Sequence, residues 1–235
     1  MHALRPQEPL NLFLGSLSEE SRQRLVSLST SLSLAHGTVL HEPEEPPTYA
    51  YFLEDGIASL VVPFDNGTSA EVGLTGREGV VGALHLLGTE VNPTYAGVQI
   101  PGAGLRIRFS ELRKVFAEAE DVRSRMLELL QYQHAISMQV SACNLLHDAE
   151  PRLARWMLML ADRTGSSTLP LTQEFIAQMV GARRTTVTTI AGSMQRAGLI
   201  EYRRGNVRLL NRTGLEQACC PCYDFTRRAL AALFR

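Results

Sequence analysis

Apolar positions in the last third of the chain recur with helical spacing in two short neighbouring segments. The first covers residues 172–180 and has one apolar side, with Thr172 placed to cap its start. The second covers about 184–197, and its apolar residues fall at i, i+3, i+4 and i+7: Val187, Ile190, Ala191 and Met194. Gly181 separates the two segments, and Gly198 suits the position after a helix C-terminus. The pattern predicts a helix-turn-helix.

The polar residues at the start of the second segment favour contact with DNA. Arg184 is followed by threonines at four of the next five positions, although threonine is a mediocre helix former. Arginine can bind both acceptors of a guanine, and threonine can contact a phosphate, a base edge or a thymine methyl. Taken alone, the segment fits an ordinary helical hairpin with a polar outer face about as well.

The next residues decide between these interpretations. Residues 199–210 alternate like a β-hairpin whose tip is Arg203-Arg204-Gly205-Asn206. A helix-turn-helix followed by a basic hairpin is a winged helix-turn-helix, in which the wing contacts phosphates beside the groove. The predicted DNA-binding residues are Thr172, Arg183, Arg184, Thr185, Thr188, Thr189, Arg203 and Arg204.

The N-terminal part has a different texture. Residues 1–30 predict a short helical lead, with a capped helix near Ser18. From about 32 to 109, short apolar or alternating runs recur between turn signals, which indicates a small β-sandwich or roll. Glu54-Asp55-Gly56 and Asn66-Gly67 are typical of hairpin turns.

A long helix is predicted after Asp121. It spans roughly 25 residues, or about 37 Å, and is apolar on more than one side. We expect it to form a dimer contact; packing within the monomer is the alternative. Further amphipathic helices are predicted at 151–164, from 213 onward and at 223–234.

Charge separates the two halves of the chain. Residues 150–235 contain 13 arginines and 6 acidic residues, a net charge of +7, whereas residues 1–149 carry −8. The predicted helix-turn-helix lies in the basic half, which favours nucleic-acid binding by residues 150–235. The sequence has no run of eighteen apolar residues and no signal-peptide pattern at its start, so we expect a cytoplasmic protein that does not enter a membrane.

This order of elements resembles the Crp/Fnr superfamily of bacterial transcription factors, most specifically between Leu171 and Val187. The resemblance implies an α+β fold with three parts: a cyclic-nucleotide-binding-like β-roll sensor domain (1–117), a long dimerisation helix (118–147) and a winged helix-turn-helix DNA-binding domain with a C-terminal tail (148–235). It implies a homodimer on a near-palindromic operator in double-stranded DNA, with RNA polymerase as a further partner. An effector in the roll would control the DNA-binding domains through the long helix.

The chain departs from the family in its phosphate-binding cassette. The matching stretches place the degenerate effector pocket at Gly82, Ala83, Leu84, Thr94 and Tyr95. Ala83 stands where the family has an acid, and Thr94 where it has an arginine. Without that arginine a charge-assisted phosphate contact is missing, so we expect no cyclic-AMP dependence, and the effector is unknown. The iron–sulfur branch of the family uses N-terminal cysteines, and none precedes Cys143.

The reading helix departs as well. Thr185 replaces the family's glutamate, Thr189 a later arginine and Arg183 the usual serine cap, while Arg184 is retained. We expect Arg184 to contact a guanine. The family's familiar half-site does not follow, because an acid-to-cytosine contact cannot form.

Cysteine spacing supplies an alternative function. Cys219-x-x-Cys222 is one half of a zinc-type pattern, but Cys143 and the histidines lie far away in the sequence. A reduced cluster without metal is therefore the favoured interpretation, and no cofactor is expected. The alternative is a small-molecule or redox sensor that uses the roll pocket or the Cys219–Cys222 tail. Neither metal-ligand spacing in the roll nor a nucleophile paired with a base is found, so an enzyme is not expected.

Overall fold

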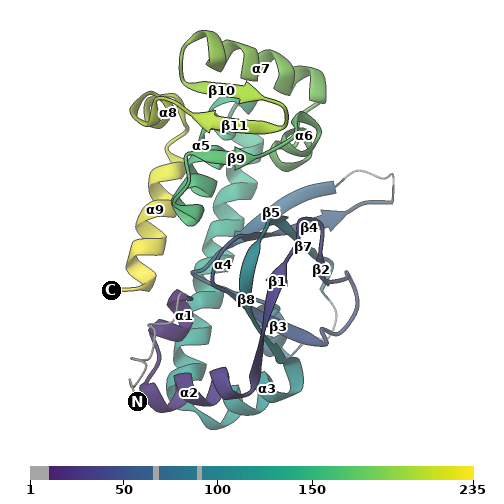
Figure 1. Cartoon of the computed structure of the whole chain (residues 1–235), viewed down its shortest axis with the longest axis vertical. Coiled ribbons are helices and arrows are strands. Elements are labelled where there is room, and N and C mark those ends of the chain that lie inside the picture. The colour runs from purple at the N-terminus through teal and green to yellow at the C-terminus, as the bar shows by residue number, and fades with distance from the viewer. Residues whose placement is uncertain (1–10, 66–68, 89–91) are drawn as a thin grey trace, which may run out of the picture.

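Two antiparallel sheets of four strands form the N-terminal roll (Figure 1). The computed structural model describes residues 11–65, 69–88 and 92–235. One sheet has the order β1-β8-β3-β6 and the other β2-β7-β4-β5. The strands are β1 (Ser29–Leu34), β2 (Val39–His41), β3 (Tyr49–Leu53), β4 (Ile57–Pro63), β5 (Ser69–Thr75), β6 (Val80–Val81), β7 (Tyr95–Ile100) and β8 (Gly102–Arg108).

Alternate residues of β3 face two different cores. Tyr51 and Leu53 lie in the core between the two sheets, whereas Ala50 and Phe52 pack in the core formed with the helices. Successive side chains of a strand point to opposite faces. Because both faces of β3 are buried, its sequence is an almost unbroken apolar run.

The sequence predicted a hairpin turn at Glu54-Asp55-Gly56, and this prediction is wrong. The turn joins β3 and β4, which belong to different sheets. Gly56 has a φ of 79°, and a Cβ there would lie 2.5 Å from the carbonyl oxygen of Ile100, so the crossover requires glycine. The predicted Asn66-Gly67 turn lies outside the described residues, although β4 and β5 on either side of it do pair.

A strand also replaces part of the expected helical lead. The edge strand β1 pairs with β8 and is mostly polar. Because it lacks a run of apolar residues, the sequence pattern did not predict it. The predicted capped helix is confirmed, since the Ser18 hydroxyl accepts the backbone N–H of Ser21. The helices up to the DNA-binding half are α1 (Leu12–Gly15), α2 (Glu19–Ser27), the 3₁₀ helix η1 (Ala83–Leu87), α3 (Phe109–Glu118), α4 (Glu120–Leu146) and α5 (Ala149–Thr164).

The predicted long helix is α4, whose 27 residues span about 40 Å at 1.5 Å per residue. The remaining elements are β9 (Thr168–Pro170), α6 (Gln173–Val180), α7 (Arg184–Arg196), β10 (Ile200–Arg203), β11 (Asn206–Leu209), α8 (Arg212–Ala218) and α9 (Cys222–Leu233). The α6–α7 unit and the small sheet β10-β11-β9 lie at one end of the molecule, with α3 at the other (Figure 1). None of the described helices is both long and apolar enough to cross a membrane.

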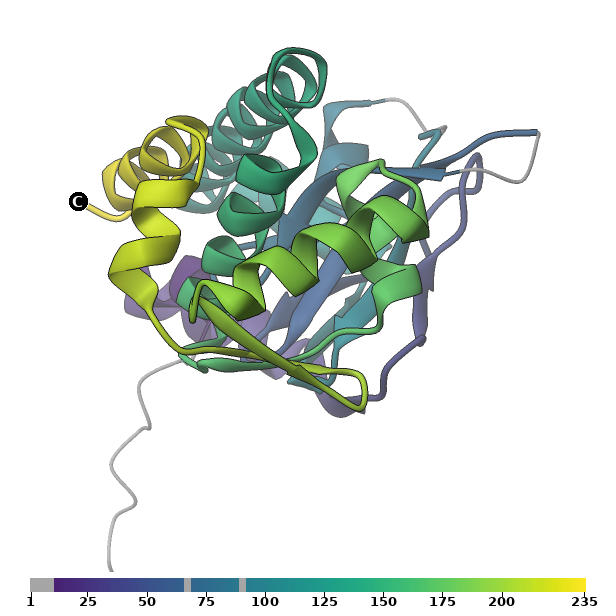
Figure 2. The ribbon, with the colours of Figure 1, turned by 90° about the horizontal axis from the view of Figure 1, so that it is seen from above.

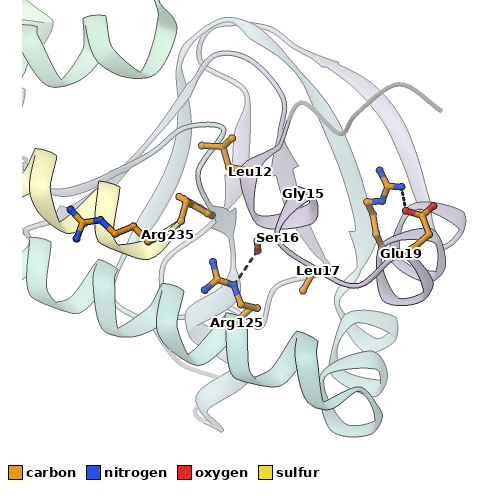
Figure 3. A pocket seen from close by; sticks show the side chains of 9 residues that line it. Leu12, Gly15, Ser16, Leu17, Glu19, Arg125 and Arg235 are labelled. Atoms are coloured by element: carbon orange, nitrogen blue, oxygen red, sulfur yellow. Dashed lines mark hydrogen bonds and ion pairs between the residues drawn. The ribbon is translucent and has the colours of Figure 1, made fainter. Parts of the chain in front are cut away.

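The tail helix α9 runs back beside α4 toward α1 (Figure 1). Arg125 of α4 fixes its end by donating to the carbonyl oxygen of Leu233 (2.6 Å) and to the hydroxyl of Ser16 (3.1 Å). Ser16, Arg125 and Arg235 are among the residues that line an open hollow of about 900 Å³ (Figure 3). The sequence grouped this tail with the DNA-binding half, but its last turns pack against the N-terminal core.

Candidate nucleic-acid interface

The two helices of the predicted helix-turn-helix are α6 and α7. The Thr172 hydroxyl accepts the backbone N–H of Phe175 at 3.2 Å and so caps α6, as predicted. Gly181 ends α6 with a φ of 61°, a conformation that glycine adopts without strain. The predicted apolar stripe of α7 is confirmed, since Val187, Ala191 and Met194 are buried and Ile190 is partly buried.

The polar residues at the start of α7 lie on the outside of the molecule, as Figure 2 shows for the helix as a whole. All eight residues that the sequence assigned to DNA contact are exposed: Thr172, Arg183, Arg184, Thr185, Thr188, Thr189, Arg203 and Arg204.

Two residues of α6 reach this surface and were not predicted. The Thr188 hydroxyl donates to the side-chain oxygen of Gln173 at 2.9 Å. The Arg184 guanidinium lies 3.7 Å from the Glu174 carboxylate, with both side chains more than two thirds exposed. An exposed pair of this kind contributes little to stability, so it leaves Arg184 available to another acceptor. The only sequence signal for either residue was its place in the first turn of α6.

The wing is the β10–β11 hairpin, in which Arg203 pairs with Asn206. Its two central residues both have positive φ, 48° for Arg204 and 77° for Gly205, as a type I′ turn requires. Asparagine or glycine is usual at the first of these positions, and an arginine there is mildly strained. This turn places the Arg204 side chain at the tip of the hairpin, where its guanidinium can reach a phosphate.

The start of α7 also lies beside the roll. Arg183, Arg184 and Ser69 of β5 line a hollow of about 770 Å³, and the Gln178 side chain of α6 donates to the Ser69 hydroxyl. Deeper contacts tie the roll to α5. Trp156 Nε1 donates to Glu71 Oε1 at 2.9 Å, and Arg163 Nε donates to Glu78 Oε1 at 2.8 Å in a buried ion pair.

Four of the five predicted effector-pocket residues line one cavity of about 140 Å³ inside the roll: Gly82, Ala83, Leu84 and Thr94. Tyr95, the first residue of β7, does not line it and instead packs against the apolar core that is shared with the DNA-binding half.

The cavity carries little positive charge. No arginine or lysine of the described residues lines it. His41 lines it, and burial, with the neighbouring His85 as a second cause, lowers the pKa of His41 to about 4. Its ring is therefore neutral at pH 7, with Nε2 3.5 Å from the Thr94 hydroxyl.

The cysteines are arranged differently from the sequence expectation. Cys220 and Cys222 lie against Cys143 and His147 of α4, with one ligand-type atom of each residue within 4.8 Å of the others. Cys219, which the sequence paired with Cys222, is not part of this group. The expectation of no metal site rested on separation along the chain, and the packing of α9 against α4 removes that separation.

Comparisons with known proteins agree with this architecture. Residues 151–218 match the family model of the Crp-like helix-turn-helix domain. The global nitrogen regulator of Synechococcus elongatus is 25% identical over 191 residues, which cover 77% of this chain and 86% of that protein.

Two solved structures share the fold. FixK2 of Bradyrhizobium japonicum has a TM-score of 0.70 at 16% identity and covers 82% of this chain and 98% of its own. A transcriptional regulator of the CRP family from Thermus thermophilus has a TM-score of 0.67 at 20% identity, with 80% and 95% covered. The predicted α+β fold, with its cyclic-nucleotide-binding-like roll and winged helix-turn-helix, is confirmed. Residues 151–218 therefore form a Crp-like helix-turn-helix domain, and the chain as a whole has the fold of solved Crp/Fnr-family regulators.

Proposed function

We propose that the protein acts as a homodimer that reads a near-palindromic operator, with α7 in the major groove and the wing on the flanking backbone. The observation that carries this proposal is the common exposure of the arginines and threonines of α7 and of the wing at one end of the molecule. In this arrangement Arg184 and Thr185, at the helix N-terminus, face base edges, as the first residues of a recognition helix do. Arg183, Arg203 and Arg204 contact phosphates, and Thr188 and Thr189 lie one turn further along the groove.

The dimer contact that we propose lies on α4. Of its four exposed large apolar residues, Leu127, Met138 and Leu145 fall on one stripe with a spacing of 11 and 7 residues, and Leu146 is next to Leu145. Gln131, His134 and Ser141 complete the same a/d pattern, which is the seam of a two-stranded coiled coil. The opposite side of α4 is already buried against the roll and α9. A second copy of α4 would cover the exposed stripe.

We further propose that DNA binding does not depend on cyclic AMP. The cavity is less than half the size of the smallest usual pocket for a drug-sized ligand, about 300 Å³. The described lining offers no cation to a phosphate, and Ala83 and Thr94 occupy the cassette positions where charge would be needed.

Two arginine substitutions test the DNA interface. Arg184→Ala should weaken binding to the selected operator by about 5- to 150-fold and remove the preference over random duplex, because a bidentate base contact is worth about 1–3 kcal/mol. Arg203→Ala should weaken both duplexes similarly and lower the salt dependence by about one phosphate contact. Arg196→Ala, at the far end of α7, is the matched control. Fluorescence anisotropy at several salt concentrations measures all three, and equal losses for Arg184→Ala on both duplexes would contradict the assignment.

A further inference from the structure

Four metal-ligating side chains meet where the C-terminal helix packs on the long helix. Cys143 lies in the last turn of α4, and His147 follows it by four residues at the C-cap of that helix. Cys220 and Cys222 flank Pro221, the N-cap residue of α9. Residues i and i+4 share one face of a helix, so α4 presents a cysteine and a histidine together. We call these four residues the Cys3His cluster.

The distances within the Cys3His cluster suit a tetrahedral zinc ion. The Sγ atoms of Cys143 and Cys220 are 3.5 Å apart, and Cys222 Sγ lies 3.6 Å from His147 Nδ1. With Zn–S near 2.3 Å and Zn–N near 2.05 Å, tetrahedral geometry places two sulfurs about 3.8 Å apart and a sulfur about 3.6 Å from a nitrogen. All four ligand atoms lie within 4.8 Å of one another, so small side-chain movements bring them around one ion.

The surroundings favour thiolates held by a metal over free thiols. The three cysteines are at most 3% exposed and form a cluster apart from the apolar cores. The Gln139 amide donates to Cys222 Sγ at 3.1 Å, an outer contact of the kind that supports a metal-bound sulfur.

A buried cation nearby lacks a counter-charge. Arg155 of α5 is 4% exposed, its NH1 donates only to the Met159 sulfur, and its Nε has no partner among the described residues. The guanidinium lies close enough to Cys143 and Cys220 to interact electrostatically with both thiols. Glu71 also interacts electrostatically with Arg155. Burial raises the pKa of Glu71 to about 8, so at pH 7 it is mostly protonated and does not neutralise the arginine. Buried charges are normally paired, and a zinc ion with three thiolates and a neutral imidazole has a net charge of −1.

We propose that the Cys3His cluster binds one zinc ion in a closed structural site. On binding, each cysteine thiol releases its proton to solvent and the imidazole binds in its neutral form. With four protein ligands the site has no open position, which is typical of structural zinc rather than catalytic zinc. The Cys-x-Cys spacing is one residue tighter than the commonest pattern, and Pro221 between the two cysteines restricts the backbone there.

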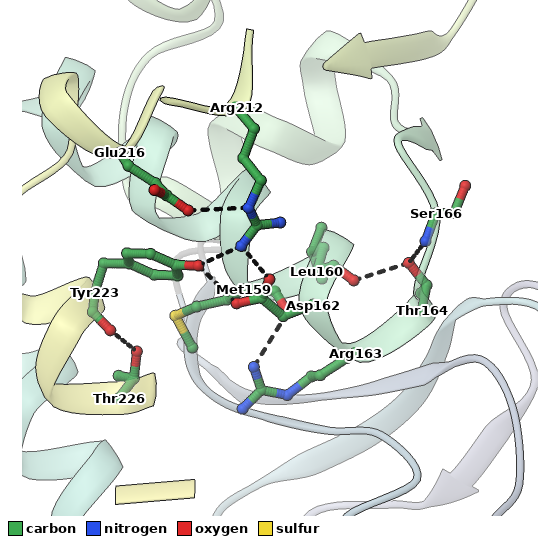
Figure 4. A network of polar contacts seen from close by, with 10 residues as sticks. All are labelled: Met159, Leu160, Asp162, Arg163, Thr164, Ser166, Arg212, Glu216, Tyr223 and Thr226. Carbon is green, nitrogen blue, oxygen red and sulfur yellow. Dashed lines mark hydrogen bonds and ion pairs between the residues drawn. The ribbon is translucent and has the colours of Figure 1, made fainter. Parts of the chain in front are cut away.

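The site would fix the start of α9 relative to the DNA-binding half. Tyr223, next to Cys222, donates to Asp162 of α5 at 2.8 Å, and Arg212 of α8 donates to both Asp162 and Tyr223 (Figure 4). Zinc therefore ties α4, α9 and, through this network, α5 and α8 into one unit. The proposal does not depend on which operator the protein reads.

Metal content of the purified full chain tests the site. Wild-type protein and Cys219→Ser, the matched control outside the Cys3His cluster, should each contain one zinc per chain by mass spectrometry of the metal. Replacement by Co²⁺ should give the visible bands and the thiolate charge-transfer absorption of a tetrahedral site. Cys143→Ser and His147→Asn should lose most of the zinc, and His147→Asn, which changes a partly exposed residue, should remain folded by circular dichroism.

Three results would overturn the proposal. The first is wild-type protein that contains no zinc and takes up neither Zn²⁺ nor Co²⁺ when reduced. The second is unchanged zinc in a folded His147→Asn variant. The third is protein that retains no metal after purification with a reductant and zinc present, and that forms a Cys143–Cys220 disulfide when the reductant is then removed and the protein is exposed to air; this would make the cluster a redox site.

Discussion

Glu71 offers a quantitative test of how the roll is joined to α5. Its carboxyl group is fully buried, and burial raises its pKa from 4.5 to about 8, although Trp156, Ser59, Arg155 and Arg163 all act to lower it. The geometry fits a protonated group. Ser59 Oγ lies 2.5 Å from Gln99 Oε1 and 3.2 Å from Glu71 Oε2. A hydroxyl has one hydrogen, so Ser59 cannot donate to both oxygens at once, and a protonated Glu71 can supply the hydrogen of its own contact with Ser59.

Glu71→Gln copies the protonated form, because an amide N–H replaces the carboxyl O–H. Between pH 4.5 and 8 the folded wild type binds more protons than the unfolded chain, so its free energy of unfolding falls as pH rises through this range. At about 1.36 kcal/mol per pKa unit, the loss is about 3 kcal/mol at pH 7 and about 5 kcal/mol at pH 9. The variant should therefore match wild type near pH 4 and exceed its stability by these amounts at higher pH.

Urea unfolding at pH 4, 7 and 9 measures this difference, with the single tryptophan, Trp156, as the probe. The indole donates to Glu71, so its emission reports on the site directly. Glu45→Gln at an exposed position is the control, and its stability should follow wild type at every pH. A difference between Glu71→Gln and wild type that stays constant across the pH range would refute a raised pKa. A variant that is less stable at pH 7 would show that the charge itself is needed.

The remaining predictions concern the dimer contact, a buried ion pair and the pocket. Met138→Glu should shift the protein toward monomer by light scattering, whereas Val26→Glu, at an exposed apolar residue of α2 away from the stripe, should not. An unchanged dimer in the first variant would remove α4 as the seam. Arg163→Met should lower the free energy of unfolding by about 3–5 kcal/mol, because it leaves Glu78 buried and unpaired. Adding Glu78→Gln should restore part of this free energy. A double variant that is no more stable than Arg163→Met would argue against the ion pair. Since the pKa of His41 is lowered to about 4, wild type should lose stability as pH falls from 6.5 toward 4, and His41→Gln should lose less; parallel acid profiles would contradict this.

The sequence predicted best where local periodicity and capping agree with tertiary packing. In α7, one apolar stripe, a polar outer side and Gly198 after its end all point to the same helix, and the structure has it at Arg184–Arg196. The strand β1 was not predicted, because an edge strand with mostly polar residues lacks the alternation of apolar and polar positions that marks a half-buried strand. The Glu54-Asp55-Gly56 turn shows that local chemistry predicts a reversal of the chain but not which strands pair.

Side chains brought together by packing were beyond the sequence. The residues that we propose to contact DNA lie within the short α6–α7 unit and the wing, so their exposure could be predicted. The Cys3His cluster joins residues more than 70 positions apart, and only the return of α9 along α4 brings them together. The available signals were the closely spaced cysteines of the tail and, at the end of the long helix, a cysteine followed four residues later by a histidine. Tyr95 was assigned to the effector pocket because its position in the sequence matches the family's phosphate-binding cassette. That match could not show that its side chain packs in another core and does not line the cavity.

Selection from a random duplex pool by the purified, ligand-free protein at physiological salt tests the central claim most directly. The account predicts enrichment of an inverted repeat with half-sites about one helical turn apart, and loss of that enrichment in Arg184→Ala. Enrichment of a single unrepeated site would contradict the dimer. A pool that stays random, with wild type and Arg184→Ala binding it equally, would contradict sequence-specific reading by α7.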